Sequence, residues 1–332
     1  MNRNTRTSRP SRHFTLRILP LLLPLLPLLP LVAALLLAGC GGRKERRAEP
    51  EQTAAEERPA VFLPMLPPAE LDAAGQQSYL ADHYWDRFDF ADTAWMARLD
   101  TTQLLRAYAD YVSILDPNDG EPLRRLMGRA KGSRYALRRF HDLAERVLYD
   151  PNSPLRSDEL YIPVLEAVVE SPLLDEYEKI APAHDLHLAR QNRVGEPAND
   201  FRYRLASGAA GRLYGLKSAY VLLFIHNPGC PMCREIREEL AASPMLAEMV
   251  ERGELTVLAL YPDEEIDEWR RESGEIPSSW LNARDEGCRM RREELYDLKA
   301  IPSLYLLDRE KRVMVKDASD VGLVEWLLDH AR

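Results

Sequence analysis

Two cysteines, Cys230 and Cys233, are the residues of this sequence best suited to chemistry. They follow an apolar run at 221–225 and the breaker Asn-Pro-Gly at 227–229, an order that predicts a buried strand, a turn and a helix. At a helix N-terminus, unpaired backbone N–H groups and the positive end of the helix dipole favour an anion, which lowers the pKa of the first thiol. Cys230 is therefore the predicted nucleophile. Cys233 lies one helical turn further on, where it can resolve a mixed disulfide.

Cysteines at this spacing also occur in two different settings, because they can form half of a zinc site or pack as small core residues. His184 and His187 lie on adjacent turns of a predicted helix and would complete a Cys2His2 set. The strand, turn and helix around the cysteines favour a redox pair instead. We therefore expect no metal and place the two histidines on a solvated helix face.

The chain downstream of the cysteines alternates predicted strands and helices. Strands are expected at 255–261, 303–307 and 312–315, and helices at 263–273, 291–298 and 321–330. Ile301-Pro302 stands directly before the second of these strands.

This arrangement resembles the thioredoxin superfamily, in which a cis-proline begins the strand that faces the active-site cysteines and leaves its backbone free to bind a substrate segment. The resemblance implies that Pro302 has this position. A cis bond before proline is uncommon, so its presence here would indicate a specific structural role. Ile301, Pro231 and Met232 are the neighbours expected to tune the cysteine pair. Because the disulfide itself is then the redox centre, no cofactor is expected.

A narrower resemblance rests on two segments before the cysteines. Residues 192–201, NRVGEPANDF, and 213–218, LYGLKS, are similar to the opening of the TlpA/ResA-like branch of envelope-anchored thiol-disulfide oxidoreductases. The resemblance covers 192–332 and implies an α/β thioredoxin-like domain, a central mixed sheet flanked by helices. It also implies partners of two kinds, protein substrates with thiols or disulfides and a redox partner.

Three positions depart from the thioredoxin pattern. Phe224 replaces the buried aspartate that assists proton transfer from the second thiol, and Gly229 directly precedes Cys230. His226 stands where a tryptophan is usual. If its imidazole lies close to Cys230, it would stabilise the thiolate as an imidazolium or shuttle a proton. If its strand turns it away from the sulfur, the ring would lie in the core. The sequence leaves these alternatives open.

Cys288 is the odd cysteine of the domain. In an oxidising compartment it is either buried and inert or a site of intermolecular pairing. Three nearby arginines would promote its thiolate if the side chain is exposed. A small apolar residue at a loop edge is the simpler interpretation.

Residues 1–40 form a predicted targeting segment. Five arginines precede an apolar stretch at 18–37, and the Leu-Ala-Gly-Cys that ends at Cys40 looks like a lipobox. The alternative, an uncleaved membrane helix, is weakened by four prolines that each remove a helix hydrogen bond. Resemblance to bacterial lipoproteins implies cleavage before Cys40 and acylation of Cys40. The chain would then be anchored in a membrane of the cell envelope, facing the periplasm or the cell surface.

Residues 41–62 are predicted to be a disordered charged tether, and 63–191 an all-α domain. Helices are expected at 100–112, 134–148, 159–169 and 176–189, with Ser171-Pro172 interpreted as a cap and first helical residue.

The segments 83–90 and 148–154 look like a helical domain of unknown function that often precedes a thioredoxin-like module in bacterial lipoproteins. Aromatic residues of this region either line a ligand groove or, more commonly, form core. They are Tyr79, Tyr84, Trp85, Phe88, Phe90 and Trp95.

Composition narrows the class of protein. The chain of 332 residues is 45% hydrophobic and 29% charged, which suits two soluble domains. Its net charge of −9 argues against a nucleic-acid partner, which would require a basic face. There is no Walker loop, no Gly-rich dinucleotide turn and no His-Glu-x-x-His motif.

These observations predict an envelope lipoprotein that acts as a thiol-disulfide oxidoreductase through Cys230 and Cys233, reducing or exchanging disulfides of extracytoplasmic proteins. The alternative is a non-catalytic binding module in which the two cysteines form a structural disulfide, because a fold does not by itself decide function.

Overall fold

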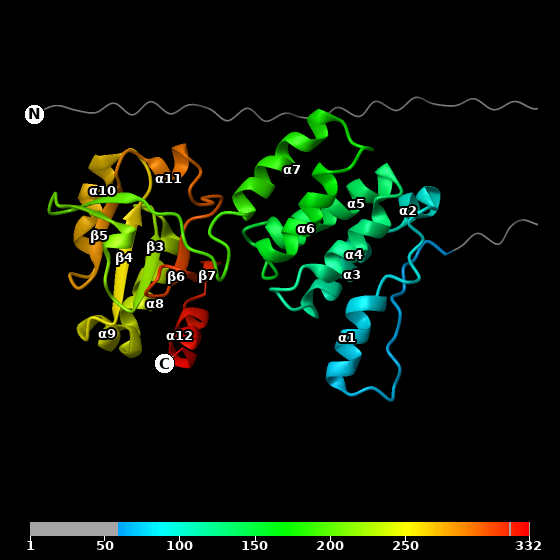
Figure 1. The fold of residues 1–332 in the computed structure, drawn as a ribbon, viewed down its shortest axis with the longest axis horizontal. Coiled ribbons are helices and arrows are strands. Elements are labelled where there is room, and N and C mark those ends of the chain that lie inside the picture. Colours follow the sequence, from blue (N-terminus) through cyan, green and yellow to red (C-terminus); the bar gives the residue numbers. More distant parts are fainter. Residues whose placement is uncertain (1–58, 319, 332) are drawn as a thin grey trace, which may run out of the picture. The chain divides into compact units, whose positions relative to one another are not determined.

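The computed structural model describes residues 59–318 and 320–331. The predicted targeting segment at 1–40 and residues 41–58 of the predicted tether lie outside this part of the chain. The described residues belong to one compact unit, in which a series of helices precedes a sheet (Figure 1). Among them, no helix combines the length and the apolar composition that crossing a membrane requires.

The first part is helical, as predicted. Its elements are α1 (Ala73–His83), α2 (Thr93–Arg98), α3 (Thr101–Ser113), α4 (Glu121–Ala130), α5 (Arg134–Ala144), a π-helical turn at Glu145–Tyr149, α6 (Asp158–Val169) and α7 (Glu176–Ala189). The four predicted helices are confirmed as α3, α5 with its π-helical turn, α6 and α7. Helices α1, α2 and α4 are additions that the sequence pattern did not lead us to expect.

Aromatic side chains form the core of this helical part. Trp85 is 3% exposed, and its ring stacks on Phe62 at 4.8 Å and meets the edge of Phe140 at 5.1 Å. Tyr84, Phe88 and Trp95 are also buried, Phe90 packs against the same cluster, and Tyr79 is partly exposed beside His83. Five of the six aromatic residues thus belong to the core, all but Tyr79, which favours the core interpretation over a ligand groove.

Helix α7 has the predicted bounds, but its N-terminal cap differs from the prediction. Ser171 does not cap the helix, because the chain turns at 171–174 and the helix begins only after Asp175. The Asp175 carboxylate accepts hydrogen bonds from the backbone N–H groups of Tyr177 and Glu178, each at 3.0 Å. The Glu178 carboxylate accepts in return from the N–H of Asp175 at 2.9 Å. This reciprocal capping box satisfies three backbone donors, which explains why the helix begins here.

Replacing this cap has a predictable effect. Asp175→Ala is expected to lower the free energy of unfolding by about 1 kcal/mol, because two N–H groups of α7 lose their acceptor. Urea denaturation followed by circular dichroism measures the loss. Tyr177→Ala is the control, since it truncates an exposed side chain of the same turn and leaves the cap intact. An equal loss in both variants would contradict the assignment of the cap.

The second part is built on one mixed sheet of seven strands, in the order β2-β1-β5-β4-β3-β6-β7. The strands are β1 (Arg202–Leu205), β2 (Ala210–Arg212), β3 (Tyr220–Ile225), β4 (Leu255–Tyr261), β5 (Leu281–Asp285), β6 (Ser303–Leu307) and β7 (Val313–Ala318). The central strands β3, β4 and β5 are parallel, and β6 is antiparallel to β3. The predicted α/β thioredoxin-like fold is confirmed.

Strand β3 lies in the middle of the sheet because both of its faces are apolar. Leu222 and Phe224 pack in one cluster with residues of α8 (Pro231–Ala242), α9 (Pro244–Glu251) and α12 (Val321–His330), while Leu223 and Ile225 pack on the opposite face. A strand buried on both faces appears in the sequence as a continuous apolar run. The chain leaves the C-terminal end of β3 at Ile225 and enters α8 at Pro231, which places the cysteines at that end of a central strand.

The predicted helix at 291–298 is wrong. Helix α11 spans only Arg289–Arg292, and Glu294 has a φ of 50°, in the left-handed region that ends a helix. Residues 293–302 instead form an irregular loop that leads into β6. Helix α10 (Ile266–Glu272) begins three residues later than predicted, and α12 has the predicted bounds.

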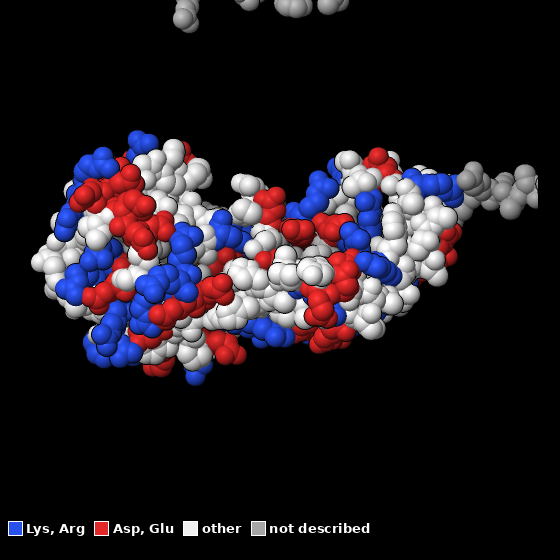
Figure 2. All heavy atoms as spheres, turned by 90° about the horizontal axis from the view of Figure 1, so that it is seen from above, with Lys and Arg blue, Asp and Glu red and all other residues white. Residues whose placement is uncertain are grey.

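Acidic and basic side chains are interspersed over the face shown in Figure 2, without a continuous basic surface. That nucleic acid is not a partner stays a prediction, which rests on the net charge of −9.

Candidate active site

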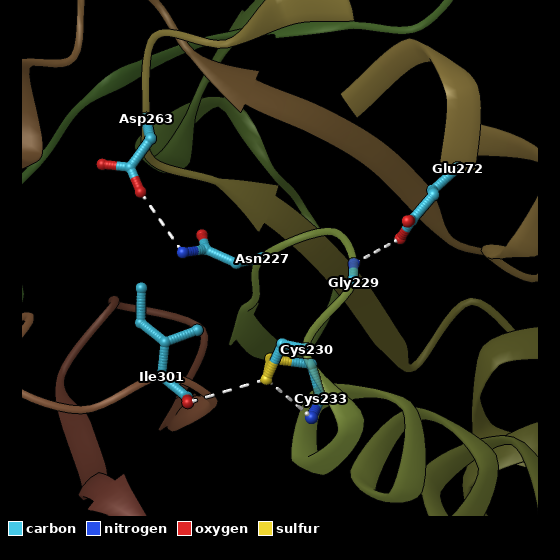
Figure 3. Close-up of a disulfide and its surroundings, with 7 residues drawn as sticks. All are labelled: Asn227, Gly229, Cys230, Cys233, Asp263, Glu272 and Ile301. Carbon is cyan, nitrogen blue, oxygen red and sulfur yellow. Dashed lines mark hydrogen bonds between the residues drawn. A yellow bond between two sulfur atoms is a disulfide. The ribbon is translucent and has the colours of Figure 1, made fainter. Parts of the chain in front are cut away.

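The two cysteines of the motif form a disulfide at the start of α8, with their Cα atoms 5.2 Å apart (Figure 3). Cys230 is the N-cap residue of the helix, and its Sγ atom accepts a hydrogen bond from the backbone N–H of Cys233 at 3.2 Å. Cys233 is only 3% exposed, whereas Cys230 is partly exposed. Cys230 therefore offers the sulfur that a substrate can reach, and the helix N-terminus favours its thiolate.

Pro302 lies opposite the disulfide. The Ile301–Pro302 peptide bond is cis, as the family resemblance implied. The carbonyl oxygen of Ile301 points toward the disulfide and lies 3.9 Å from Cys230 Sγ (Figure 3). The fold thus brings together residues that are 71 positions apart in the chain.

Charged residues that no sequence motif singled out surround the cysteines in a pocket of about 120 Å³. Arg237 lies one turn after Cys233 and pairs with Glu275 at 2.6 Å. A carboxylate oxygen of Glu272, at the end of α10, accepts a hydrogen bond from the backbone N–H of Gly229 at 2.8 Å. The helical spacing from Cys233 could have indicated Arg237. Nothing local in the sequence indicated Glu272 or Glu275, because the fold brings them from another helix and the turn that follows it.

Gly229 is required by its backbone conformation. Its φ is 69°, which L-amino acids with a side chain rarely adopt. This conformation turns the chain from β3 into α8 and directs the N–H toward Glu272. The turn between β3 and α8 therefore explains why a glycine stands at position 229, where the sequence departs from the thioredoxin pattern.

Pro231 and Met232 occupy the first turn of α8. Pro231 is the first helical residue, where its missing N–H costs no helix hydrogen bond. The Met232 side chain is 54% exposed, so it presents an apolar surface beside Cys230. Both neighbours thus lie where an approaching substrate would contact them.

His226 belongs to the core. It is 6% exposed, its ring stacks on Phe224 at 5.0 Å, and its Nε2 atom has no hydrogen-bond partner among the described residues. Burial, together with the nearby positive charge of Arg237, lowers the pKa of His226 to about 4. The imidazole is therefore neutral near pH 7 while the cysteines are joined as a disulfide, and its burial favours the alternative in which the ring turns into the core.

Phe224, at the position where thioredoxin carries an aspartate, is fully buried in the same core cluster as Cys233 and Ile236. The carboxylates that line the cysteine pocket are those of Glu272 and Glu275 instead. Any acid–base assistance to Cys233 from a carboxylate would come from that side of the pocket.

The remaining candidate side chains lie elsewhere. His184 Nε2 and His187 Nε2 both contact the carboxylate of Glu294, at 3.1 and 3.4 Å, rather than the cysteines. No group of three or more His, Cys, Asp or Glu side chains suited to a metal occurs in the described part of the chain. Cys288 is a free, buried cysteine, and burial, reinforced by Asp285, raises the pKa of its thiol. The alternative of an exposed, reactive Cys288 is therefore wrong.

A central mixed sheet, a Cys-x-x-Cys disulfide at a helix N-terminus and a cis-proline opposite it together define a thioredoxin-like domain. Comparison with solved structures agrees with this assignment of the fold. A thioredoxin-like protein from Bacteroides caccae ATCC 43185 is 41% identical with a TM-score of 0.75, over 81% of this chain and 98% of that one. The chain belongs to this family of thioredoxin-like proteins.

Two further structures match about two fifths of the chain. The C-terminal domain of an uncharacterized protein from Bacteroides fragilis NCTC 9343 is 44% identical, with a TM-score of 0.40, over 41% of this chain and 98% of that one. A domain of a possible thiol-disulfide isomerase from Cytophaga hutchinsonii ATCC 33406 is 23% identical, with a TM-score of 0.36, over 43% of this chain and 95% of that one.

The helical part also has a match. The family DUF5106, described as a domain of unknown function, matches residues 39–192. The comparison with curated protein sequences found no match.

Proposed function

We propose that this protein is a thiol-disulfide oxidoreductase of the cell envelope that acts through Cys230 and Cys233 and is anchored by a lipid on Cys40. The observation that most supports the activity is the position of Cys230, which is partly exposed at the N-terminus of α8 and faces the Ile301 carbonyl across the site. The family of thioredoxin-like proteins to which the chain belongs agrees with a general redox role.

In the reducing direction, the Cys230 thiolate attacks one sulfur of a substrate disulfide. A bond forms between Cys230 and the substrate, and the other substrate sulfur leaves as a thiolate that takes up a proton. Cys233 then loses its proton, and its thiolate attacks the Cys230 sulfur. The Cys230–Cys233 bond forms as the mixed disulfide breaks, and the substrate leaves with two thiols. A redox partner must then supply two electrons to reopen the protein's disulfide.

The substrates we propose are extracytoplasmic proteins with accessible disulfides. An extended segment would lie along the backbone at Ile301, whose carbonyl oxygen faces Cys230 and would accept a hydrogen bond from an N–H group of the segment, with the exposed Met232 providing apolar contact. The lipid on Cys40 and the charged tether would hold the site near the membrane surface.

The reduction potential of the Cys230–Cys233 pair tests this function. We expect a value between about −120 and −270 mV, with rapid exchange, as in working oxidoreductases. The measurement uses the chain from Gly41 onward carrying Cys288→Ala, with thiol trapping across a series of glutathione ratios. Cys288 is buried, so the substitution should leave the potential unchanged, and the unsubstituted chain is the control. A value below about −300 mV with slow exchange would contradict the proposal and indicate a structural disulfide in a binding module.

A further inference from the structure

The loop that carries Ile301-Pro302 has no regular secondary structure to fix it. Residues 293–302 follow the short helix α11 and precede β6. The backbone N–H groups of the loop's first three residues bond to carbonyl oxygens of α11. A loop of this kind keeps one position only if side-chain contacts hold it. The contacts that it makes therefore determine where the Ile301 carbonyl lies relative to Cys230.

The beginning of the loop is held by α7 and the segment that follows it. Glu294 contacts His184 and His187 of α7, at 3.1 and 3.4 Å. The carbonyl oxygen of Leu295 accepts hydrogen bonds from the side-chain amides of Asn192 at 2.8 Å and Asn199 at 2.9 Å. The histidine pairs are exposed and should contribute little, whereas the bonds to Leu295 are partly buried.

The end of the loop is held by a buried ion cluster centred on Asp158, the first residue of α6. Lys299 of the loop lies 3.5 Å from Asp158 Oδ1 and 2.5 Å from Asp297 Oδ2, and its ammonium lies 4.5 Å from the centre of the Tyr149 ring. All three charged side chains are at most 10% exposed. Lys299 precedes Pro302 by three residues, so this contact is made close to the active site.

The Asp158 carboxylate also binds β7, the strand next to β6, which follows the cis-proline. Asp158 Oδ2 lies 2.7 Å from Lys316 Nζ on β7, which is the sheet neighbour of β6. The Lys316 ammonium donates in addition to the carbonyl oxygens of Ala189 and Gln191 at the end of α7, at 2.9 and 2.6 Å. Two lysines of the thioredoxin-like part thus converge on one carboxylate of the helical part.

We propose that Asp158 is a positioning residue for the active site, and that the helical part, through Asp158, holds the Ile301-Pro302 loop where it binds an extended disulfide-containing segment of a substrate protein. This inference rests on the proposed thiol-disulfide exchange. It gives the helical part a function in recognition of polypeptide substrates, because a small disulfide that touches only the sulfur of Cys230 does not need the loop.

The kinetic test compares Asp158→Asn with the unsubstituted chain. The variant keeps the shape of the side chain and removes the charge that binds Lys299 and Lys316. For an unfolded polypeptide with one disulfide, we expect KM to rise about tenfold through loss of positioning. The rate with bis(2-hydroxyethyl) disulfide and the reduction potential of the cysteine pair should stay unchanged.

Glu159→Gln is the matched control. Glu159 is the next residue of α6 and pairs with Arg193 at 2.5 Å, so its substitution removes an ion pair from the same helical turn without touching the loop. Lys299→Met is a second test variant that acts from the loop side and preserves the length of the side chain. Equal KM values in Asp158→Asn and Glu159→Gln, with both proteins folded, would overturn the proposal.

Hydrogen exchange gives a readout that does not depend on activity. We expect the amides of residues 296–301 and 303 to exchange about tenfold faster in Asp158→Asn than in Glu159→Gln, because local opening becomes easier. Unchanged exchange would refute the positioning role even if the enzyme assay succeeds. Failure of the unsubstituted chain to exchange disulfides with either substrate, by contrast, would refute the proposed function while leaving the loop contact measurable.

Discussion

Cys233→Ser is expected to accumulate mixed disulfides with substrate proteins, and Cys230→Ser is expected to accumulate none. In the first variant the partly exposed Cys230 still attacks a substrate, but no second thiol remains to release it. In the second variant the remaining sulfur, that of Cys233, is 3% exposed and cannot be reached by a folded or unfolded substrate. The effect is close to all-or-none, because each variant removes a different step.

Acid quenching, alkylation and electrophoresis without reductant measure the trapped complexes. Both variants should carry Cys288→Ala, and the double variant that lacks Cys230 and Cys233 provides the background. Because Cys288 is buried, this third substitution should not change the yield of complexes. Similar amounts of complex in the two single variants would contradict the order of attack.

His226→Phe is expected to remove a large part of the acid sensitivity of the fold. The pKa of His226 is about 4 in the folded protein, because of burial and the charge of Arg237, against an ordinary value of 6.5. As pH falls below 6.5, the unfolded chain takes up a proton that the folded protein does not, so the free energy of unfolding falls. Between pH 7.5 and 5, this group accounts for a loss of about 2 kcal/mol.

The difference in unfolding free energy between wild type and His226→Phe, from urea denaturation at several pH values, measures this contribution. Phenylalanine retains a flat ring that can stack on Phe224 and has no titrating group. His226→Gln should flatten the pH dependence in the same way although it lacks the ring. If both variants lose stability with falling pH as steeply as the wild type, the titrating group lies elsewhere.

Much of the sheet could be predicted from local pattern alone. The segment 255–261, apolar except for the partly buried Thr256, corresponds to β4 residue for residue, because a central parallel strand is buried on both faces and favours apolar side chains. The turn between β3 and α8 was also predictable. It contains a proline and a glycine, which interrupt regular structure, and the glycine has a positive φ.

The helical part was less predictable where helices are short or exposed. Helix α1 has no buried residue and α2 has only six residues, so neither carries a long apolar period. Helix α4 does carry a buried stripe at Leu123, Leu126 and Met127, and its spacing was sufficient to predict it. The three arginines of α4 and its low mean hydropathy obscured that stripe.

In the candidate active site, too, some residues were predictable from the sequence and others were not. Cys230, Cys233 and Pro302 follow from short motifs, whereas Glu272 and the ion cluster do not. Asp158 and Lys299 are 141 residues apart, and a single Asp or Lys in a sequence rich in charge carries no sign of burial. Only the packing of α6 against the loop before β6 reveals that this pair is shielded from water, where a carboxylate and an ammonium interact strongly.

The short span of the disulfide has a consequence for the free energy of the two redox states. Cys230 and Cys233 are separated by three positions, so their bond closes a very small ring. In a chain-entropy description, cross-linking so small a ring restricts the unfolded chain by only about 2 kcal/mol, less than a long-range bridge would. Opening and closing the bond should therefore leave the scaffold folded, as the proposed transfer of two electrons to a substrate disulfide requires.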